Sequence, residues 1–227
     1  MININKGISL IFTMIMKIYL TRHSKTVWNQ EKRLQGRCDS PLNSDGIENA
    51  LALKQYIKES HMYFDYIFSS PILRAYHTAT LLFDNQEIIQ DDRLMEMNFG
   101  VFEGRKISDI LETDYEIYHN LWYHPEKFTY IPGGESYDDV IARVEGFLND
   151  LKNLDSQSSI FIVTHGMYFI VMLATMLHMD KKDYIQINQK VVEGCSLTVI
   201  EYQEDYQLLT YNQCHYLPHL MNASFAK

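Results

Sequence analysis

The fold is decided by the stretch around the first predicted strand, where residues 17–29 read KIYLTRHSKTVWN. Within it, Ile18 to Thr21 form a short apolar run with β-branched members. Such a run is typical of a strand that is covered on both faces in a mainly parallel sheet. The run ends in Arg22 and His23, so this strand presents a guanidinium group and an imidazole at its carboxyl end.

A second stretch has the same design, because residues 160–166 read IFIVTHG, an apolar run that ends in His165. Ligands of open α/β sheets bind outside the carboxyl ends of the strands. The two strand-end histidines are therefore predicted to face one common site. Further strands are predicted at Tyr66–Phe68, Ser196–Tyr202 and Gln207–Tyr211.

Helical patterns alternate with these strands. In residues 136–152, apolar side chains recur at helical spacing behind Ser136, which is placed to cap the helix. Residues 167–179 are apolar on nearly every face, which indicates a buried helix. A helix that begins near residues 44–45 is predicted to bury Ile47, Ala50, Leu51 and Ile57. The alternation predicts an α/β fold, a three-layer α/β/α sandwich with a mostly parallel, twisted sheet.

The composition is that of a globular protein with one core. With 227 residues, 46% of them hydrophobic, the chain can bury a single sizeable core. A formal net charge of -9 and few clustered Lys and Arg side chains argue against nucleic acid or an anionic membrane surface as the partner. Three cysteines without a Cys-x-x-Cys pair fit neither a disulfide scaffold nor a zinc cluster, so a cytoplasmic location is expected.

The N-terminus superficially resembles a signal peptide, because Lys6 precedes the apolar run Ile8–Met16. No small-residue cleavage site follows, and the run is too short and too interrupted to span a bilayer. We therefore expect a single domain over residues 16–227, preceded by a disordered or misassigned extension over residues 1–15. Residues 105–134, rich in Tyr, Trp, His and Phe, interrupt the alternation and are expected to form a cap-like insertion.

A further pattern brings a second arginine to the predicted site. Pro71 suits the first turn of a helix, which places Arg74 in that same turn. A cation next to the positive end of a helix dipole is misplaced unless an anion binds nearby. An arginine beside exposed backbone amides forms a phosphate site, and the sequence therefore predicts that Arg74 binds an oxyanion.

Two residues are candidates for proton transfer and for the stabilisation of charge. Glu96 lies among apolar neighbours in the stretch LMEMNFG over residues 94–100. A carboxyl group in such surroundings can stay partly protonated, as a general acid for an alkoxide leaving group requires. His165 is placed to donate a hydrogen bond to phosphoryl oxygens as charge develops in the transition state.

Taken together and in this order, the patterns resemble the histidine phosphatase superfamily of phosphoglycerate-mutase-like proteins. The signature of that family is Leu-Thr-Arg-His-Gly-x-Thr-x-x-Asn, followed by arginine, glutamate and second-histidine segments. The resemblance covers residues 17–219 and includes RLQGRCDSPL at residues 33–42 and PGGES at residues 132–136. Within the family, the chain resembles the phosphatase branch, which contains broad-specificity and alpha-ribazole-type phosphatases.

The resemblance implies a role for each matching residue. His23 is expected to attack phosphorus and become phosphohistidine, while Glu96 protonates the leaving oxygen and later activates the water that hydrolyses the phosphoenzyme. Three side chains are expected to hold the phosphoryl oxygens: Arg22, Arg74 and His165. Four residues are expected to line the substrate pocket: Asn29, Gln35, Gly36 and Gly166. No metal or cofactor is expected, since the arginines supply the positive charge.

The chain is therefore predicted to be a metal-independent phosphatase that hydrolyses small phosphomonoesters. Family mutases supply additional cations from an inserted segment, whereas residues 105–134 hold only Arg105, Lys106 and Lys127. Two alternatives stay open: phosphoryl transfer of the phosphoglycerate mutase type, and a non-catalytic module on the same fold that binds a phosphorylated ligand. The physiological substrate and the choice between monomer and homodimer stay open as well.

One departure from the family pattern is Ser24, which replaces the glycine that usually follows the nucleophile. If this position needs a positive φ angle or a close approach of backbone to phosphate, serine introduces strain or narrows the pocket. Because serine is small, we expect an altered rate rather than a loss of function.

Overall fold

The computed structural model describes residues 15–188 and 192–220, and at its centre lies a six-stranded sheet in the order β3-β2-β4-β1-β5-β6. The strands are β1 (Met16–Arg22), β2 (Tyr66–Ser69), β3 (Ile89–Gln90), β4 (Ser159–Thr164), β5 (Leu197–Tyr202) and β6 (Tyr206–Gln213). Parallel pairing joins β1, β4, β2 and β3, whereas β5 runs antiparallel to both β1 and β6. The predicted mostly parallel sheet is confirmed.

The two strands that end in histidine lie side by side at the centre of the sheet. Ile18 of β1 is paired with Ile160 of β4 and with Ile200 of β5, and all three side chains are fully buried. Strands at the centre are covered on both faces, which explains why their apolar runs are continuous. No residue of the edge strand β6 is buried, and its sequence contains more polar residues.

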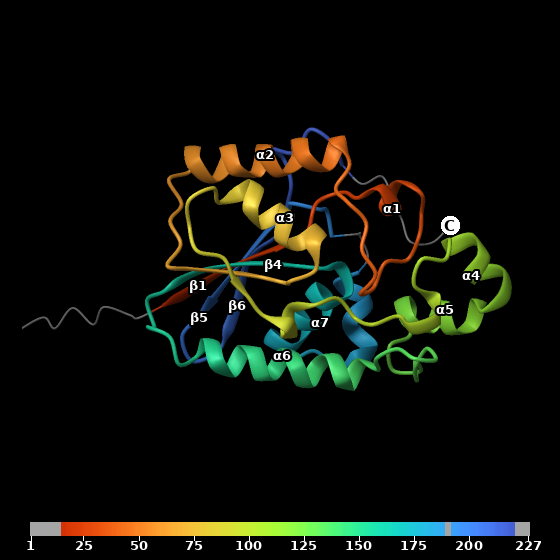
Figure 1. Ribbon diagram of the computed structural model, residues 1–227. Coiled ribbons are helices and arrows are strands. Elements are labelled where there is room, and N and C mark those ends of the chain that lie inside the picture. Colours follow the sequence, from red (N-terminus) through yellow and green to blue (C-terminus); the bar gives the residue numbers. More distant parts are fainter. Residues whose placement is uncertain (1–14, 189–191, 221–227) are drawn as a thin grey trace, which may run out of the picture.

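Helices cover both faces of the sheet, with α2 and α3 on one face and α6 and α7 on the other (Figure 1). The α-helices are α1 (Val27–Gln30), α2 (Ser44–Glu59), α3 (Leu73–Leu82), α4 (Ile107–Thr113), α5 (Tyr115–Tyr123), α6 (Tyr137–Leu151) and α7 (Gly166–Met176). Three short 3-10 helices are η1 (Asp92–Leu94), η2 (Gly100–Phe102) and η3 (Lys181–Gln186). Buried apolar side chains form one cluster on each side of the sheet. The three-layer α/β/α architecture is confirmed.

Two helix predictions are confirmed in detail. Ser136 caps α6 in a capping box, because its side chain accepts from the backbone N–H of Asp139 and the Asp139 side chain accepts from the Ser136 N–H. Helix α7 is buried along nearly its whole length, as expected for a helix that is apolar on every face.

The predicted buried face of α2 was partly wrong. Ala50 and Ile57 are buried as expected, but Ile47 is 37% exposed and Leu51 is 47% exposed. The buried stripe instead passes through Leu53, which lies three residues from Ala50 and four from Ile57 on one side of the helix. Apolar character alone therefore did not identify the side of α2 that faces the sheet.

Residues 105–134 contain α4 and α5, which lie at the same end of the molecule as α1 (Figure 1). Backbone hydrogen bonds tie the start of this segment to the loop after α1, from Leu34 N to Arg105 O (3.0 Å) and from Ile107 N to Lys32 O (2.9 Å). The expected N-terminal extension lies outside the described residues, apart from Ile15. Among the helices that the structure describes, none is long and apolar enough to cross a membrane.

Candidate active site

His23 follows directly on β1, and both its backbone and its ring are fixed. Its N–H donates to the Thr164 carbonyl (2.8 Å), which continues the pairing of β1 with β4 beyond the strand end. The side chain is buried, and Nδ1 lies 2.7 Å from the Ser24 carbonyl oxygen. Because a carbonyl oxygen only accepts hydrogen bonds, Nδ1 carries the proton. The lone pair that a nucleophile needs therefore lies on Nε2.

Burial and neighbouring cations keep the two strand-end histidines neutral. Burial lowers the pKa of His23 well below its usual value of 6.5, and the charges of Arg74 and Arg22 lower it further. The pKa of His165 is also lowered well below its usual value, by burial first and then by Arg74 and His23. The two ring centroids lie 5.2 Å apart. The predicted meeting of these imidazoles at one site is thus seen in the structure.

Arg74 is the second residue of α3 and is 1% exposed. Its Nε donates to His23 Nε2 (3.2 Å), so the guanidinium group lies against the lone pair of the candidate nucleophile. Its other nitrogens donate to the carbonyl oxygens of Gly36 (2.6 Å) and Cys38 (2.8 Å) and to the Asp39 carboxylate (3.1 Å). Arg74 therefore joins His23 to the loop over residues 36–39.

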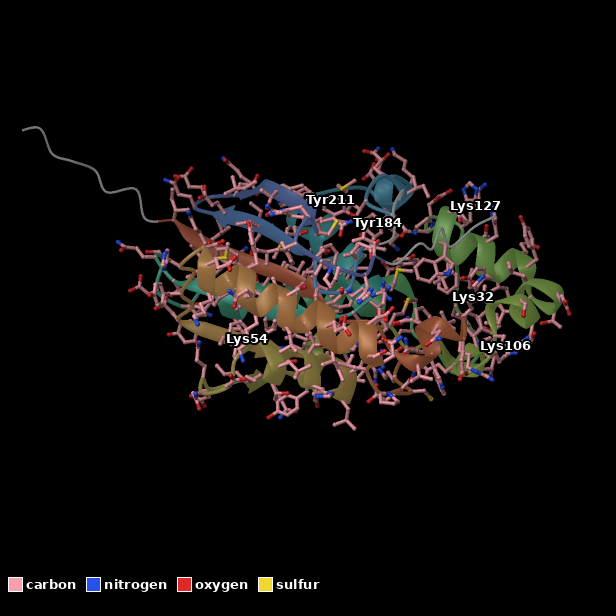
Figure 2. The ribbon with its side chains drawn as sticks, turned by 90° about the horizontal axis from the view of Figure 1, so that it is seen from above. Lys32, Lys54, Lys106, Lys127, Tyr184 and Tyr211 are labelled. Atoms are coloured by element: carbon pink, nitrogen blue, oxygen red, sulfur yellow. The ribbon has the colours of Figure 1, made fainter. Side chains whose placement is uncertain are left out.

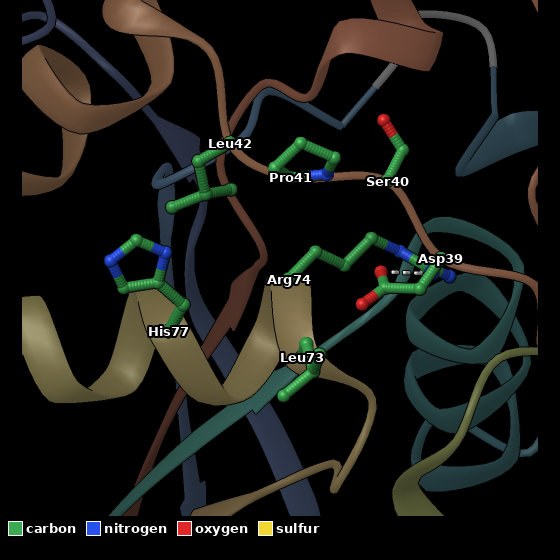
Figure 3. Close-up of a pocket in the computed structure, with 7 residues that line it drawn as sticks. All are labelled: Asp39, Ser40, Pro41, Leu42, Leu73, Arg74 and His77. Carbon is green, nitrogen blue, oxygen red and sulfur yellow. Dashed lines mark hydrogen bonds and ion pairs between the residues drawn. The ribbon is translucent and has the colours of Figure 1, made fainter.

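Arg74 also bounds an open pocket on the surface of α3 (Figure 3). The pocket lies between residues 39–42 and the first turns of the helix, where Leu73 and His77 line it. Its walls are mainly apolar, apart from the ion pair between Arg74 and Asp39. The pocket is thus adjacent to the loop that Arg74 holds.

His165 precedes α7 and is fully buried. Its Nε2 lies 2.7 Å from the Ser70 hydroxyl, which also accepts from the backbone N–H of Ile72 (3.3 Å) at the start of α3. Ser70 therefore fixes the ring of His165 relative to the helix that carries Arg74. Nδ1 of His165 is buried and has no hydrogen-bond partner among the described residues.

Arg22 and Gly166 complete the surroundings of the two histidines. Arg22 is buried, and its Nη1 donates to the Val192 carbonyl (3.0 Å). A Cβ atom added at Gly166 would lie 3.5 Å from Arg22 Nε and 3.8 Å from a carboxylate oxygen of Glu96. Gly166 therefore lies between the arginine and the glutamate, where a side chain would reduce the space.

Glu96 is buried and its carboxyl group is held by backbone donors. Oε1 accepts from the N–H groups of Met97 (2.9 Å) and Tyr168 (2.9 Å), and Oε2 accepts from Met167 (3.1 Å). Two of these donors belong to the first turn of α7, whose N–H groups have no partner within the helix. The end of the helix that follows His165 thus also orients the candidate acid.

Three of the predicted pocket residues, Gly36, Asn29 and Gln35, differ in the contacts that they make. The carbonyl of Gly36 accepts from Arg74. The Asn29 carboxamide oxygen accepts from the N–H and the hydroxyl of Thr26, where it caps α1. Gln35 is buried, and its Oε1 lies 3.1 Å from the same hydroxyl as the alternative acceptor of its single proton. Asn29 and Gln35 are thus linked to each other through Thr26, and their roles toward a substrate stay predictions.

Glu103 is a structural partner of this site that sequence reasoning did not identify. Its carboxylate accepts from the backbone N–H groups of Arg37 (2.9 Å), Cys38 (2.7 Å) and Phe99 (2.9 Å). It therefore joins the loop bound by Arg74 to the segment that follows Glu96. The only signal in the sequence is its position beside Gly104, which does not reveal a contact with residues about 65 positions away.

Ser24 does not have the backbone strain that was considered for it. It is fully buried and is not among the residues with a positive φ angle. Its N–H donates to the Thr78 hydroxyl (3.1 Å), and its side chain lies beside the buried thiol of Cys195. A serine at this position is therefore compatible with the observed backbone.

The arrangement suits a tetrahedral oxyanion at a nucleophilic nitrogen. Two imidazoles and two guanidinium groups from separate parts of the chain gather around one buried region, and a carboxyl group lies beside them. Arginine and neutral histidine donors stabilise negative charge on phosphoryl oxygens. Among the described residues, no three His, Cys, Asp or Glu side chains gather as metal ligands would.

Comparison with known proteins gives a family match over most of the chain. The model of the histidine phosphatase superfamily (branch 1) matches residues 18–213. A protein of Yersinia pestis (strain Pestoides F) named "Probable phosphoglycerate mutase GpmB" is 31% identical over 192 residues, which cover 84% of this chain and 86% of that protein.

Solved structures show the same fold. YhfR of Bacillus stearothermophilus has a TM-score of 0.82 and 26% identity, over 89% of this chain and 99% of that chain. The alpha-ribazole phosphatase from Shigella flexneri has a TM-score of 0.76 and 26% identity, over 87% and 96% of the two chains. These similarities confirm the predicted phosphoglycerate-mutase-like architecture.

Proposed function

The chain belongs to the histidine phosphatase superfamily, and on that premise we propose that it hydrolyses small phosphomonoesters through a phosphohistidine on His23. The observation that carries this proposal is the state of the His23 ring. Nδ1 is bonded to the Ser24 carbonyl and Nε2 faces the Arg74 guanidinium group. A neutral imidazole with its lone pair next to a phosphate-binding cation is a nucleophile prepared for phosphorus.

In the first step, Nε2 of His23 attacks phosphorus and the bond to the ester oxygen breaks. The N–H of Arg74 turns from the ring to a phosphoryl oxygen when the ester binds, which frees the lone pair. The ring gains positive charge as the N–P bond forms, and the Ser24 carbonyl stabilises this charge through Nδ1–H. Arg22, Arg74 and His165 stabilise the oxygens, as expected for catalysis by positioned charges.

Glu96 handles the proton in both steps. Its carboxyl group donates a proton to the leaving oxygen, which departs as an alcohol. In the second step, the Glu96 carboxylate takes a proton from water while the water oxygen attacks phosphorus and the N–P bond breaks. Inorganic phosphate then leaves, and both His23 and Glu96 regain their starting protonation.

The second candidate function is phosphoryl transfer of the mutase type, because the Yersinia pestis relative carries the name of a probable phosphoglycerate mutase. A mutase has to retain an intermediate with several negative charges, which requires additional cations. Figure 2 shows Lys32, Lys106 and Lys127 at the end of the molecule that carries α4 and α5. Arg105 in that region pairs with Asp114. This small number of cations favours hydrolysis over mutase activity.

The experiment is phosphate release from p-nitrophenyl phosphate in the presence of a chelator, with wild type, His23→Ala and Glu96→Gln. We expect activity in the wild type and none in His23→Ala. A wild type that binds phosphate but releases none from any ester would instead support a non-catalytic binding module. Turnover of 3-phosphoglycerate that depends on a trace of 2,3-bisphosphoglycerate would support the mutase.

A further inference from the structure

The candidate acid lies in a segment that has no regular secondary structure. Residues 95–99 lie between η1 and η2 and belong to neither a helix nor a strand. A group that transfers a proton in a transition state has to be held within a fraction of an ångström of its acceptor. The backbone around Glu96 must therefore be fixed by groups from other elements.

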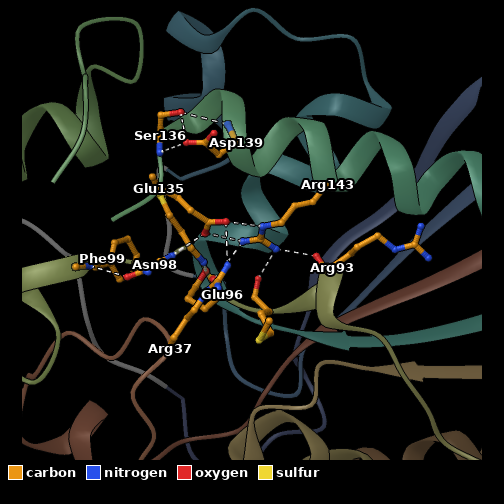
Figure 4. Close-up of polar contacts among 12 residues, drawn as sticks. Arg37, Arg93, Glu96, Asn98, Phe99, Glu135, Ser136, Asp139 and Arg143 are labelled. Carbon is orange, nitrogen blue, oxygen red and sulfur yellow. Dashed lines mark hydrogen bonds and ion pairs between the residues drawn. The ribbon is translucent and has the colours of Figure 1, made fainter. Parts of the chain in front are cut away.

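One guanidinium group supplies most of this fixation (Figure 4). Arg143 on α6 donates from Nη1 to the carbonyl oxygens of Arg93 (2.7 Å) and Met95 (2.6 Å), and from Nη2 to the carbonyl of Glu96 itself (3.1 Å). The remaining carbonyl in this run, that of Leu94, accepts from the Thr164 hydroxyl (2.7 Å). All four carbonyls of residues 93–96 are thus bound by side chains of α6 and β4.

Glu135 orients this arginine. Its carboxylate accepts from Arg143 Nε (3.1 Å) and Nη2 (3.2 Å), and the two side chains are only 16% and 13% exposed. The same carboxylate accepts from the N–H of Asn98 (2.8 Å) and from Arg37 (3.0 Å). We call this pair the Glu135–Arg143 clamp, because it binds the chain on both sides of Glu96.

The clamp also contacts the helix that holds the Glu96 carboxyl group. The Arg143 guanidinium carbon lies 4.8 Å from the centre of the Tyr168 ring, as in a cation–π contact. The N–H of Tyr168 is one of the donors to Glu96 Oε1. Arg143 therefore contacts both the backbone that carries Glu96 and the residue that orients its side chain.

We propose that the Glu135–Arg143 clamp is a positioning device for Glu96, and that its loss impairs protonation of the leaving oxygen more than attack on phosphorus. The proposal rests on the proposed function, because it takes Glu96 as the general acid. Neither clamp residue touches the phosphoryl group in the mechanism above. Their effect has to pass through the position of the Glu96 carboxyl group.

Position and charge can be separated at Arg143. Its charge also acts on His165, so a purely electrostatic role would survive any substitution that keeps a cation. Lysine keeps the charge but has neither the fork that binds the Glu135 carboxylate nor enough donors at fixed angles for three carbonyls. Arg143→Lys should therefore behave like Arg143→Gln if the role is positional.

The test compares two esters of similar size, p-nitrophenyl phosphate and benzyl phosphate. The p-nitrophenolate leaves without a proton, whereas benzyl alcohol has to be protonated as it leaves. kcat/KM reports the steps up to departure of the leaving group, and general acid catalysis contributes about 10²–10⁴-fold to such a step. In Arg143→Lys and Arg143→Gln, we expect kcat/KM for benzyl phosphate to fall at least about tenfold more than for p-nitrophenyl phosphate.

Arg93→Gln is the matched control. The Arg93 side chain also links the segment before Glu96 to α6, with hydrogen bonds to Asp91, Gly146 and Asp150, and none of these bonds goes to residues 95–98. Its loss should change kcat/KM for both esters by the same factor. Equal losses for the two esters in the Arg143 variants would overturn the positioning role, as would full rescue by lysine.

If the Arg143 variants do not fold, Glu135→Gln provides the same comparison, because glutamine keeps the shape of the side chain and removes the ionic partner. A selective loss for benzyl phosphate supports the clamp, and an equal loss for both esters overturns it. Failure of the proposed function looks different. The wild type would then be inactive on both esters, or Glu96→Gln would leave benzyl phosphate turnover unchanged, and the clamp proposal would fall with it.

Discussion

Ser24 is the residue at which the chain departs from its family, and its surroundings explain why the change is tolerated. The residue is fully buried but needs no left-handed backbone. Burial raises the pKa of the adjacent Cys195 thiol to about 12, while the Ser24 side chain opposes this shift. The backbone of this loop is closely approached by Gly194, where an added Cβ would lie 2.7 Å from the His23 carbonyl oxygen.

We predict that Ser24→Gly changes kcat/KM for p-nitrophenyl phosphate by less than about threefold and lowers the free energy of unfolding by about 1 kcal/mol, because glycine gains backbone freedom in the unfolded chain. Gly194→Ala should lower the free energy of unfolding by about 1–3 kcal/mol, since its Cβ has no space. Urea denaturation measures the free energy of unfolding of both variants, and steady-state kinetics measures kcat/KM of Ser24→Gly. If Ser24→Gly raised kcat/KM for p-nitrophenyl phosphate by tenfold or more, the serine would be shown to narrow the pocket.

The sequence predicted which side chains lie together at the candidate site, but not their protonation or orientation. Strand ends and the family pattern singled out His23, His165 and Arg74, because chemical type and position along the chain were sufficient. The tautomer of His23 depends on the Ser24 carbonyl, which is a local backbone geometry. The Glu135–Arg143 clamp depends on contacts between residues about 50 positions apart, which no local pattern shows.

Among the larger elements, the loop over residues 36–38 connects Arg74 with the segment that carries Glu96. Its backbone is bound from one side by Arg74 and from the other by Glu103. Gly36 has a φ angle of +57°, and a Cβ there would lie 2.0 Å from a carboxylate oxygen of Glu103. That carboxylate cannot move without the loss of its bonds to backbone N–H groups.

We predict that Gly36→Ala lowers both stability and kcat/KM. The left-handed backbone alone costs about 1–2 kcal/mol for a residue with a side chain. Displacement of Glu103 should cost at least about 2 kcal/mol more, because it breaks hydrogen bonds to a charged group. Gly133→Ala is the matched control. Gly133 also has a positive φ angle, of +75°, but a Cβ added there would lie 3.9 Å from the nearest atom, which leaves room for it. Equal losses of unfolding free energy in the two variants, measured in urea, would contradict the role of Glu103.

The spacing of apolar residues predicted where the helices lie in the sequence. It predicted only in part which side of each helix is buried. Helix α6 has a clear apolar stripe and a cap, and both agree with the sequence. In α2, Ile47 and Leu51 are as apolar as the buried Leu53, so the choice of face is made by the sheet and by α3 rather than by α2 itself. Tertiary packing decides where local pattern is ambiguous.

At the scale of the whole molecule, the fold buries two neutral histidines among cations. In the unfolded chain His23 and His165 titrate near 6.5, whereas burial and the arginines lower both pKa values well below this in the folded protein. Below pH 6.5 the unfolded chain therefore binds protons that the folded protein does not. The contribution of these groups to stability is complete above the unfolded pKa and is lost as the pH falls through the folded values.

We predict that the free energy of unfolding decreases from about pH 6.5 to about pH 5, by at most about 1.4 kcal/mol per pH unit for each histidine. His165→Gln should reduce this slope, because glutamine does not titrate. His77→Gln, at an exposed position of α3, should leave the slope as in the wild type. Urea denaturation at several pH values measures the slope of the free energy of unfolding with pH. An unchanged slope in His165→Gln would contradict the burial of a neutral imidazole.

The layer architecture was predictable because the strands that form its centre have the strongest apolar runs. Ile18 and Ile160 are fully buried and paired, as continuous apolar runs in β1 and β4 require. The order of the strands was not predictable in the same way. Strand β5 lies antiparallel beside β1, and this pairing joins residues about 180 positions apart. No local pattern in the sequence indicates such a pairing.

Trapping the phosphoenzyme shows whether His23 carries the phosphoryl group. Glu96→Gln should form it from p-nitrophenyl phosphate, which needs no acid, but hydrolyse it slowly, because no carboxylate activates the water. After an alkaline quench and digestion, mass spectrometry of the peptides locates the phosphoryl group. We predict that it lies on His23 and is absent in the double variant with His23→Ala. A phosphoryl group on His165, or an active enzyme that never becomes covalently phosphorylated, would contradict the mechanism.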